Sequence, residues 1–167
     1  MGASARLYTL NYDEAKTYLW AAFFVACNLV LPQVFHLIPQ GGIIFAPLSL
    51  VILAGAYKFG WRVGLIAALA SPIVNHLLTG MPAWNVLPVM TFKLVVLALA
   101  AGFTAQHFKK VTFALLIGIV LVSMLIGGLG ELAITGGIEA TIQDFTIGWP
   151  GILLQVIGVY LVCRFIG

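Results

Sequence analysis

The chain has 167 residues, of which 62% are hydrophobic and 8% are charged, and its mean hydropathy is +1.12. Because an average soluble domain carries about a quarter charged residues, this composition excludes a soluble globule. The formal net charge is +3, from eight Lys and Arg against five Asp and Glu. In so apolar a chain, this balance favours a role in membrane orientation over nucleic-acid binding.

Six apolar stretches follow one another along the chain. They fall at about 17–35, 43–57, 61–79, 88–106, 111–131 and 145–166. A transmembrane helix needs about 20 mostly apolar residues, so about six spans use up the whole chain. The stretches do not alternate as the strands of an outer-membrane barrel do. We therefore predict an all-α bundle of six transmembrane helices in a single membrane domain, residues 1–167.

The N-terminal residues 1–16 and the stretch 43–57 are the two segments that we do not expect to form regular spans. Residues 1–16 contain Asp13, Glu14 and Lys16, and no small-residue cleavage pattern follows the first apolar run, so we expect a short N-terminal segment and a retained first span. The stretch 43–57 is short and lies beside glycines and Pro47, so we expect it to enter the bilayer as an irregular segment.

Basic residues give the orientation. Seven of the eight flank span ends that share one side of a six-span layout: Arg6, Lys16, Lys58, Arg62, Lys109, Lys110 and Arg164. The loops on the other side, about 36–42, 80–87 and 132–144, contain no Lys or Arg. Basic residues near span ends mark the cytoplasmic face, so we expect both termini inside the cell, in the inner membrane of a prokaryote.

Polar and small side chains separate between the two halves of the spans. The polar set maps to the middle or outer part of the bilayer and comprises Asn28, Gln33, Asn75, His76, Lys93, Glu131 and Gln155. The cytoplasmic halves carry mostly Ala and Gly. Because polar groups and irregular backbone at membrane depth must be covered by protein or water, we predict a polar cavity that opens outward.

Lys93 is the one basic residue inside a predicted span. An unpaired charge there costs roughly 2.5 kcal/mol or more, so Lys93 must pair, snorkel or face water. It either forms a structural ion pair with Glu131 or holds an anionic group of a solute. Two further acids beside the following outer loop, Glu139 and Asp144, are expected to be solvated.

The remaining candidates have two readings each. His76 is either a hydrogen-bonded interior histidine or a ligand contact, and its neighbour Asn75 points about 100° away around the helix. Trp84 and Trp149 belong either to an aromatic belt or to a binding site. Cys27 and Cys163 lie in apolar runs.

The sequence carries no spacing of metal ligands, no nucleotide-binding loop and no catalytic motif, so we expect no enzyme, cofactor or metal site.

Several short motifs resemble a known family, the S components of energy-coupling factor (ECF) vitamin transporters. The motifs are Ala22-xxx-Ala26, His36-Leu37-Ile38-Pro39, Gly42-Ile43-Ile44-Phe45-Ala46-Pro47, Phe59-Gly60-Trp61-Arg62-Val63-Gly64, Ser71-Pro72 and Thr79-Gly80-Met81-Pro82. The likeness covers nearly the whole chain in layout and about a third of it in specific motifs.

The resemblance implies a membrane subunit that captures a water-soluble vitamin or precursor from outside. Such a subunit docks on a shared transmembrane (T) subunit driven by two ATPases, here through Ala22 and Ala26. The outer loops would close over the solute. The substrate contacts expected on this basis, together with the polar set above, are Asn28, His36, Asn75, His76, Trp84, Asn85, Lys93, Glu131, Trp149 and Gln155.

Two departures bear on the solute. Relatives tend to have an acidic residue near the position of Lys93, which makes an anion such as pantothenate a candidate. The nickel and cobalt branch carries a histidine after the initial Met, where this chain has Gly2, so a metal substrate is disfavoured. The alternatives are a non-catalytic membrane scaffold and a small stand-alone secondary transporter, which would need a coupling-ion site and inverted repeats.

Overall fold

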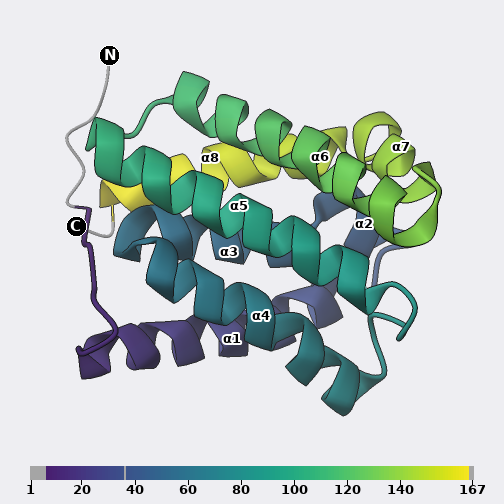
Figure 1. Ribbon diagram of the computed structural model, residues 1–167, viewed down its shortest axis with the longest axis horizontal. Helices are drawn as coiled ribbons and strands as arrows, with labels where there is room; N and C mark the ends of the chain where they lie inside the picture. Colours follow the sequence, from purple (N-terminus) through teal and green to yellow (C-terminus); the bar gives the residue numbers. More distant parts are fainter. Residues whose placement is uncertain (1–6, 36, 166–167) are drawn as a thin grey trace.

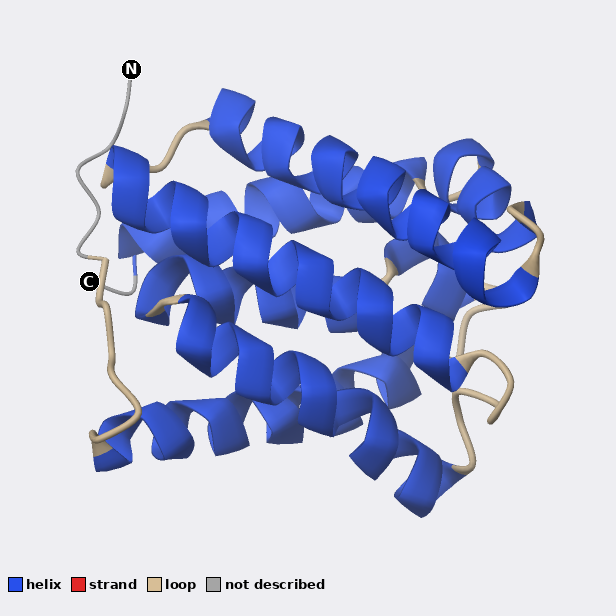
Figure 2. Ribbon diagram, viewed as in Figure 1, coloured by secondary structure: helices blue, strands red, loops and turns tan. Residues whose placement is uncertain are grey.

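A computed structural model describes residues 7–35 and 37–165, and every regular element in these ranges is a helix (Figures 1 and 2). His36 and Arg6 lie outside the described residues. The helices are α1 (Ala15–Phe35), α2 (Gly41–Phe45), α3 (Pro47–Phe59), α4 (Trp61–Thr79), α5 (Leu87–Phe108), α6 (Phe113–Thr135), α7 (Glu139–Thr146) and α8 (Trp149–Phe165). A helix therefore forms in each of the six apolar stretches.

The centre of the bundle is α3, which packs against α1, α4, α5 and α8 (Figure 1). Every residue from 51 to 60 is buried, including Tyr57 and Lys58. This burial follows from the sequence, because a helix that is apolar on all sides has to be surrounded by other elements. The Tyr57 hydroxyl donates to the Lys110 carbonyl at 2.7 Å and so ties α3 to the turn between α5 and α6.

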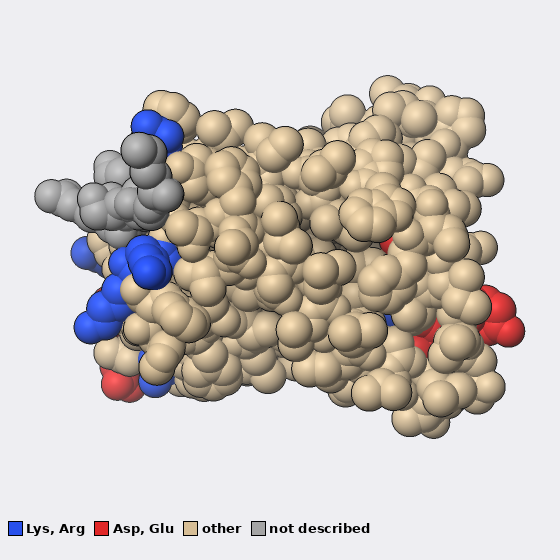
Figure 3. Space-filling model, turned by 90° about the horizontal axis from the view of Figure 1, so that it is seen from above, with Lys and Arg blue, Asp and Glu red and all other residues tan. Residues whose placement is uncertain are grey.

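Four helices, α1, α4, α5 and α6, are long and apolar enough to cross a membrane, whereas α3 and α8 are apolar but shorter. Charged side chains gather at the two ends of the molecule, and a band without them lies between (Figure 3). Lys and Arg dominate the end where α1 begins and α8 ends, and acidic side chains mark the opposite end (Figures 1 and 3). We call these the basic end and the acidic end. An apolar band between two charged ends is the pattern expected of a membrane protein.

Three element boundaries differ from the sequence-based prediction. The stretch 43–57 is divided at Ala46, whose left-handed backbone (φ 42°, ψ 55°) ends α2 and precedes Pro47 at the start of α3. The predicted outer loop 132–144 contains the end of α6 and most of α7. The last long helix, α8, begins at Trp149 rather than near 145, because Ile147 and Gly148 interrupt the helical path after α7.

Small residues serve two different purposes in the bundle. Gly64 and Gly102 lie at close helix contacts: a Cβ on Gly64 would stand 2.4 Å from the Ala56 Cβ, and one on Gly102 would stand 2.4 Å from the Trp61 Cα. Ala22 and Ala26, by contrast, are both exposed on α1. The small residues of α4 and α5 are therefore used inside the molecule, whereas those of α1 face outward.

Candidate functional site

The acidic end holds an ion cluster built from three helices. Lys93 Nζ of α5 lies 2.9 Å from Glu131 Oε2 of α6 and 2.9 Å from Asp144 Oδ2 of α7. Thr141 Oγ1 of α7 donates to the same Glu131 oxygen. The Lys93–Glu131 ion pair, one of the two alternatives considered for Lys93, is thus present, and Asp144 joins it.

Glycines on α6 make room for the cluster. A Cβ on Gly127 would stand 2.9 Å from Lys93 Cγ, and one on Gly128 would stand 2.7 Å from Thr141 Cγ2. One turn later, Glu131 is 3% exposed and faces the same neighbours. The run Gly127-Gly128 therefore lets the lysine stem and α7 approach α6 closely enough for Glu131 to reach both.

The cluster carries more negative than positive charge. Glu131 and Asp144 share the single ammonium of Lys93, so the formal charge is −1 when both carboxyls are ionised. Burial raises the pKa of Asp144; Lys93 lowers it through a hydrogen bond and by its charge, and the Glu131 charge raises it again. The net direction of the pKa shift is upward, mainly because burial disfavours the ionised carboxylate, with the nearby Glu131 charge adding to it.

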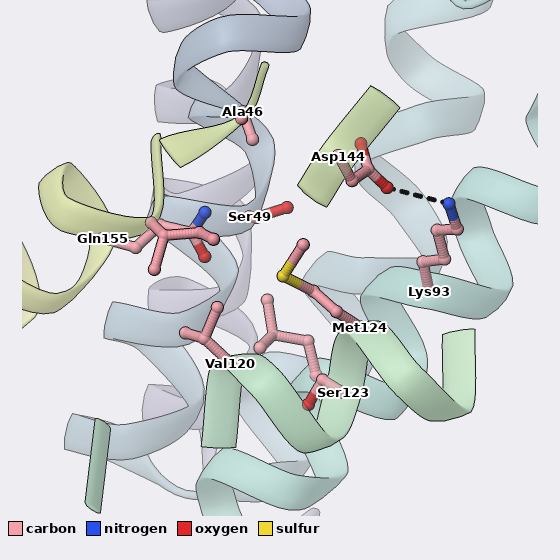
Figure 4. A pocket seen from close by; sticks show the side chains of 11 residues that line it. Ala46, Ser49, Lys93, Val120, Ser123, Met124, Asp144 and Gln155 are labelled. Atoms are coloured by element: carbon pink, nitrogen blue, oxygen red, sulfur yellow. Dashed lines mark hydrogen bonds and ion pairs between the residues drawn. The ribbon is translucent and has the colours of Figure 1, made fainter. Parts of the chain in front are cut away.

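A cavity of about 80 Å³ adjoins the ion cluster. Figure 4 shows Ser49 of α3 and Gln155 of α8 on one side of it and Lys93 and Asp144 on the other. Ser123 of α6 also lines the cavity; it is 5% exposed, and its buried Oγ has no hydrogen-bond partner in the described part of the chain. Such an orphaned hydroxyl needs a partner that water or a ligand can supply.

Two larger cavities continue from this one along the acidic end. The first, of about 360 Å³, shares Ala46, Ser49, Lys93 and Asp144 with it. The second, of about 430 Å³, shares Gly42, Pro47, Leu48 and Met90 with the first and reaches Asn75 and Gln33. Ligand sites of small molecules usually occupy about 300–1,000 Å³, so each of these two larger cavities is of the right size.

A second polar cluster joins α1 to α4. Asn28 Nδ2 donates to Ser71 Oγ at 2.9 Å, and Asn75 Nδ2 donates to the backbone carbonyls of Asn28 and Ser71, each at 2.9 Å. Asn28 is fully buried and lines none of these three cavities, whereas Asn75 lines the 430 Å³ cavity. Asn28 therefore has a structural role at this position: its backbone carbonyl accepts a hydrogen bond from Asn75 and so orients the Asn75 side chain.

The other predicted contacts lie at the acidic end but outside these cavities. His76 Nδ1 is 2.9 Å from the Pro82 carbonyl, and its ring packs 5.1 Å from that of Trp84. Trp84 and Trp149 are 71% and 57% exposed, and Asn85 is exposed as well. The structure thus brings Lys93, Glu131 and Gln155 to one site and Asn75 to its neighbour, and it leaves His76 and both tryptophans apart.

Sequence reasoning missed three residues at the cavity: Asp144, Ser49 and Ser123. Asp144 was expected to be solvated, and this was wrong, because α7 folds back and directs it at Lys93. One sequence signal was available: Thr141 and Asp144 are three residues apart, which places them on one face of any helix formed there. Ser49 and Ser123 are isolated in apolar runs and give no such signal.

No group of His, Cys, Asp and Glu within residues 7–35 and 37–165 is arranged to hold a metal ion. No family model, curated protein or solved structure matches the chain. The site's geometry therefore carries the functional argument.

Proposed function

We propose that this protein is the substrate-capture subunit of an ATP-driven ECF importer, which binds a water-soluble vitamin or precursor and performs no catalysis itself. The observation that carries the proposal is the group of neighbouring cavities at the acidic end, lined by half-buried Lys93 and by buried Asn75 and Gln155. A scaffold protein has no need for buried polar groups around open space, because each of them costs free energy unless it is satisfied.

The layout of charge supports an orientation for this subunit. The basic end carries the residues that mark a cytoplasmic face, so the cavity end faces outward and the chain crosses the membrane of a prokaryotic cell six times. In this orientation both termini are cytoplasmic. The short α3 completes its crossing with α2, and the break at Ala46 lies beside the cavity, where irregular backbone is tolerated.

The docking partner in the proposal is the T subunit, with its two ATPases. Ala22 and Ala26 form a small-residue stripe on the exposed face of α1, which allows a partner helix to approach closely. Comparable pairs on α4 and α5, Gly64/Ala68 and Ala101/Ala105, are buried inside the bundle. The α1 pair is therefore available for a neighbour.

The capture role is tested by native mass spectrometry of the protein purified in mild detergent. We expect a stoichiometric small-molecule adduct that is released on denaturation and identified by its mass. The matched variant is Ser123→Val, which fills the cavity wall without altering charge and should weaken the adduct. An apo mass that stays unchanged across a vitamin panel would contradict the proposal and favour a scaffold.

Docking is tested separately from binding. We expect Ala22→Trp together with Ala26→Trp to abolish uptake in cells while leaving solute binding intact, because the bulky rings block close helix approach. The control is Leu125→Trp, a change at a position already occupied by a large exposed side chain on a different helix, α6. Loss of binding and uptake together in the double variant would contradict the separation of roles.

A further inference from the structure

We infer that the solute presents a positively charged group to the Asp144 carboxylate at the 80 Å³ cavity. This inference rests on the proposed capture function and adds the chemical class of the solute. It differs from the pantothenate-like anion suggested by Lys93 in the sequence.

The first argument is the charge of the site. Within the described residues, the groups that titrate around this cavity are Lys93 from α5, Glu131 from α6 and Asp144 from α7. The cavity-lining residues of α3 and α8, Ser49, Ile152 and Gln155, are uncharged. One positive charge faces two negative ones, so a cation brings the cluster to neutrality, whereas an anion brings it to −2.

The second argument is that Lys93 is already engaged. Its ammonium lies 2.9 Å from a carboxylate oxygen on each side. An anionic solute could take only the third N–H of this ammonium, and it would then lie close to the Glu131 and Asp144 carboxylates, which repel it. A cation can instead approach Asp144, whose side chain is 38% exposed, while the Lys93–Glu131 pair stays intact.

The third argument is the polar wall of the same cavity. Ser49 and Gln155 line the space with a hydroxyl and an amide group (Figure 4). Hydroxyl and amide oxygens accept hydrogen bonds from ammonium or ring N–H groups. The cavity thus offers acceptors for a cationic head in addition to the Asp144 carboxylate.

Helix ends do not reverse this balance. The N-terminal ends of α3 and α8 lie beside the cavity and α7 ends there at Thr146, close to the lining residue Gly148. A helix terminus corresponds to about half a charge, positive at the N-terminus and negative at the C-terminus. The positive half-charges of the two N-termini are partly offset by the negative half-charge at the end of α7. Asp144 remains the full negative charge nearest the cavity, and it shares its only ammonium, Lys93, with Glu131.

The inference is tested by direct binding to the purified protein with three probes. Thiamine carries a permanent positive charge, nicotinamide is uncharged at neutral pH, and pantothenate is anionic. We expect thiamine to bind most tightly and Asp144→Asn to weaken its binding by at least about tenfold, because a charge-assisted contact is lost. The control Glu139→Gln removes an exposed acid from the same helix and should leave binding unchanged.

A second variant, Lys93→Met, is expected to have opposite effects on the binding of a cationic and of an anionic solute. Removing the ammonium in Lys93→Met leaves the site more negative, so we expect cation binding to be unchanged or tighter. An anion held by Lys93 would instead be lost. Thermal unfolding of each variant shows that it is folded at the temperature of the binding measurement.

The outcomes separate this inference from the proposed function. Preferred binding of pantothenate or nicotinamide, or a co-purified solute without a positive group at neutral pH, overturns the cation assignment and leaves solute capture standing. If no molecule co-purifies and none of the three probes binds, both the cation assignment and the proposed capture function are overturned. Tightest thiamine binding with loss in Asp144→Asn supports both.

Discussion

At the scale of single residues, Lys93 illustrates how a charge is accommodated inside an apolar bundle. Its stem passes Gly127 and its ammonium meets Glu131 and Asp144. The sequence indicated the Glu131 partner because both residues map to the outer part of neighbouring predicted spans. It did not indicate Asp144, because the position of a short helix in a loop depends on tertiary packing that local patterns do not encode.

Replacement of Lys93 should be costly for stability. We expect Lys93→Met to lower the free energy of unfolding by about 2 kcal/mol, because two carboxylates lose their shared counter-ion. Adding Glu131→Gln to this variant should restore part of the loss. Thermal unfolding in detergent measures both effects, and Lys110→Met, at an exposed position, is the control expected to stay within about 0.5 kcal/mol of the parent. A loss of equal size in the control would contradict the ion-cluster account.

Asp144 should give the protein a measurable pH dependence. Its pKa is raised above the ordinary value of 3.8, mainly by burial. Between that value and the raised native pKa, the folded state binds more protons than the unfolded state, so the free energy of unfolding falls as pH rises through this window. We expect this slope to be absent in Asp144→Asn. Melting temperatures of both proteins, measured from about pH 4 to about pH 7 and subtracted, isolate the effect. Parallel curves would show that Asp144 does not contribute.

At the scale of elements, the long helices could be predicted and the short ones could not. The stretches 61–79 and 88–106 correspond closely to α4 and α5, because a long apolar run leaves the backbone no option except internal hydrogen bonds. The short helices α2 and α7 have 5 and 8 residues, and their stability comes from docking rather than from local propensity. The candidate site lies against these short helices, which is why Asp144 of α7 was missed, whereas Ser49 and Ser123 were missed because they are isolated in the apolar runs of α3 and α6.

Close helix packing at Gly102 can be tested with a single methyl group. A Cβ there would stand 2.4 Å from the Trp61 Cα, so we expect Gly102→Ala to destabilise the α4–α5 contact by about 1–3 kcal/mol. Gly118 of α6 is the matched control, since a Cβ at this position has no neighbour within 4 Å. Gly118→Ala should be neutral or stabilise by up to about 1 kcal/mol, because alanine favours the helix. Equal effects at the two positions in thermal unfolding would contradict this packing argument.

At the scale of the whole molecule, the separation of charge is the dominant feature. Basic side chains lie at one end, acidic side chains mark the other, and an apolar band lies between them (Figure 3). The ion cluster and the cavities lie at the acidic end. The sequence predicted this polarity because Lys and Arg occur at alternate loops. It also predicted a polar cavity at the acidic end, although several of its individual contacts, including Trp84 and Trp149, lie elsewhere.

The orientation of the molecule can be measured by cysteine labelling in intact cells. In a background with Cys27→Ala and Cys163→Ala, we expect Glu139→Cys to react with a membrane-impermeant maleimide from outside. Lys110→Cys should react only after the cells are permeabilised, because it lies at the basic end. The reverse pattern would place the cavity on the cytoplasmic side.

The length of α3 has a consequence for how deep a solute can lie in the protein. Its 13 residues span about 20 Å at a rise of 1.5 Å per residue, whereas the hydrocarbon core is about 30 Å thick. In the proposed six-span orientation, α3 is therefore about 10 Å shorter than the bilayer core, and α2 completes the crossing beside the cavity that Ala46 and Ser49 line. Under the proposed capture function, the start of α3 limits how deep a solute can lie. We then expect substitutions at the cavity rim to change which solute is accepted rather than how deep it reaches.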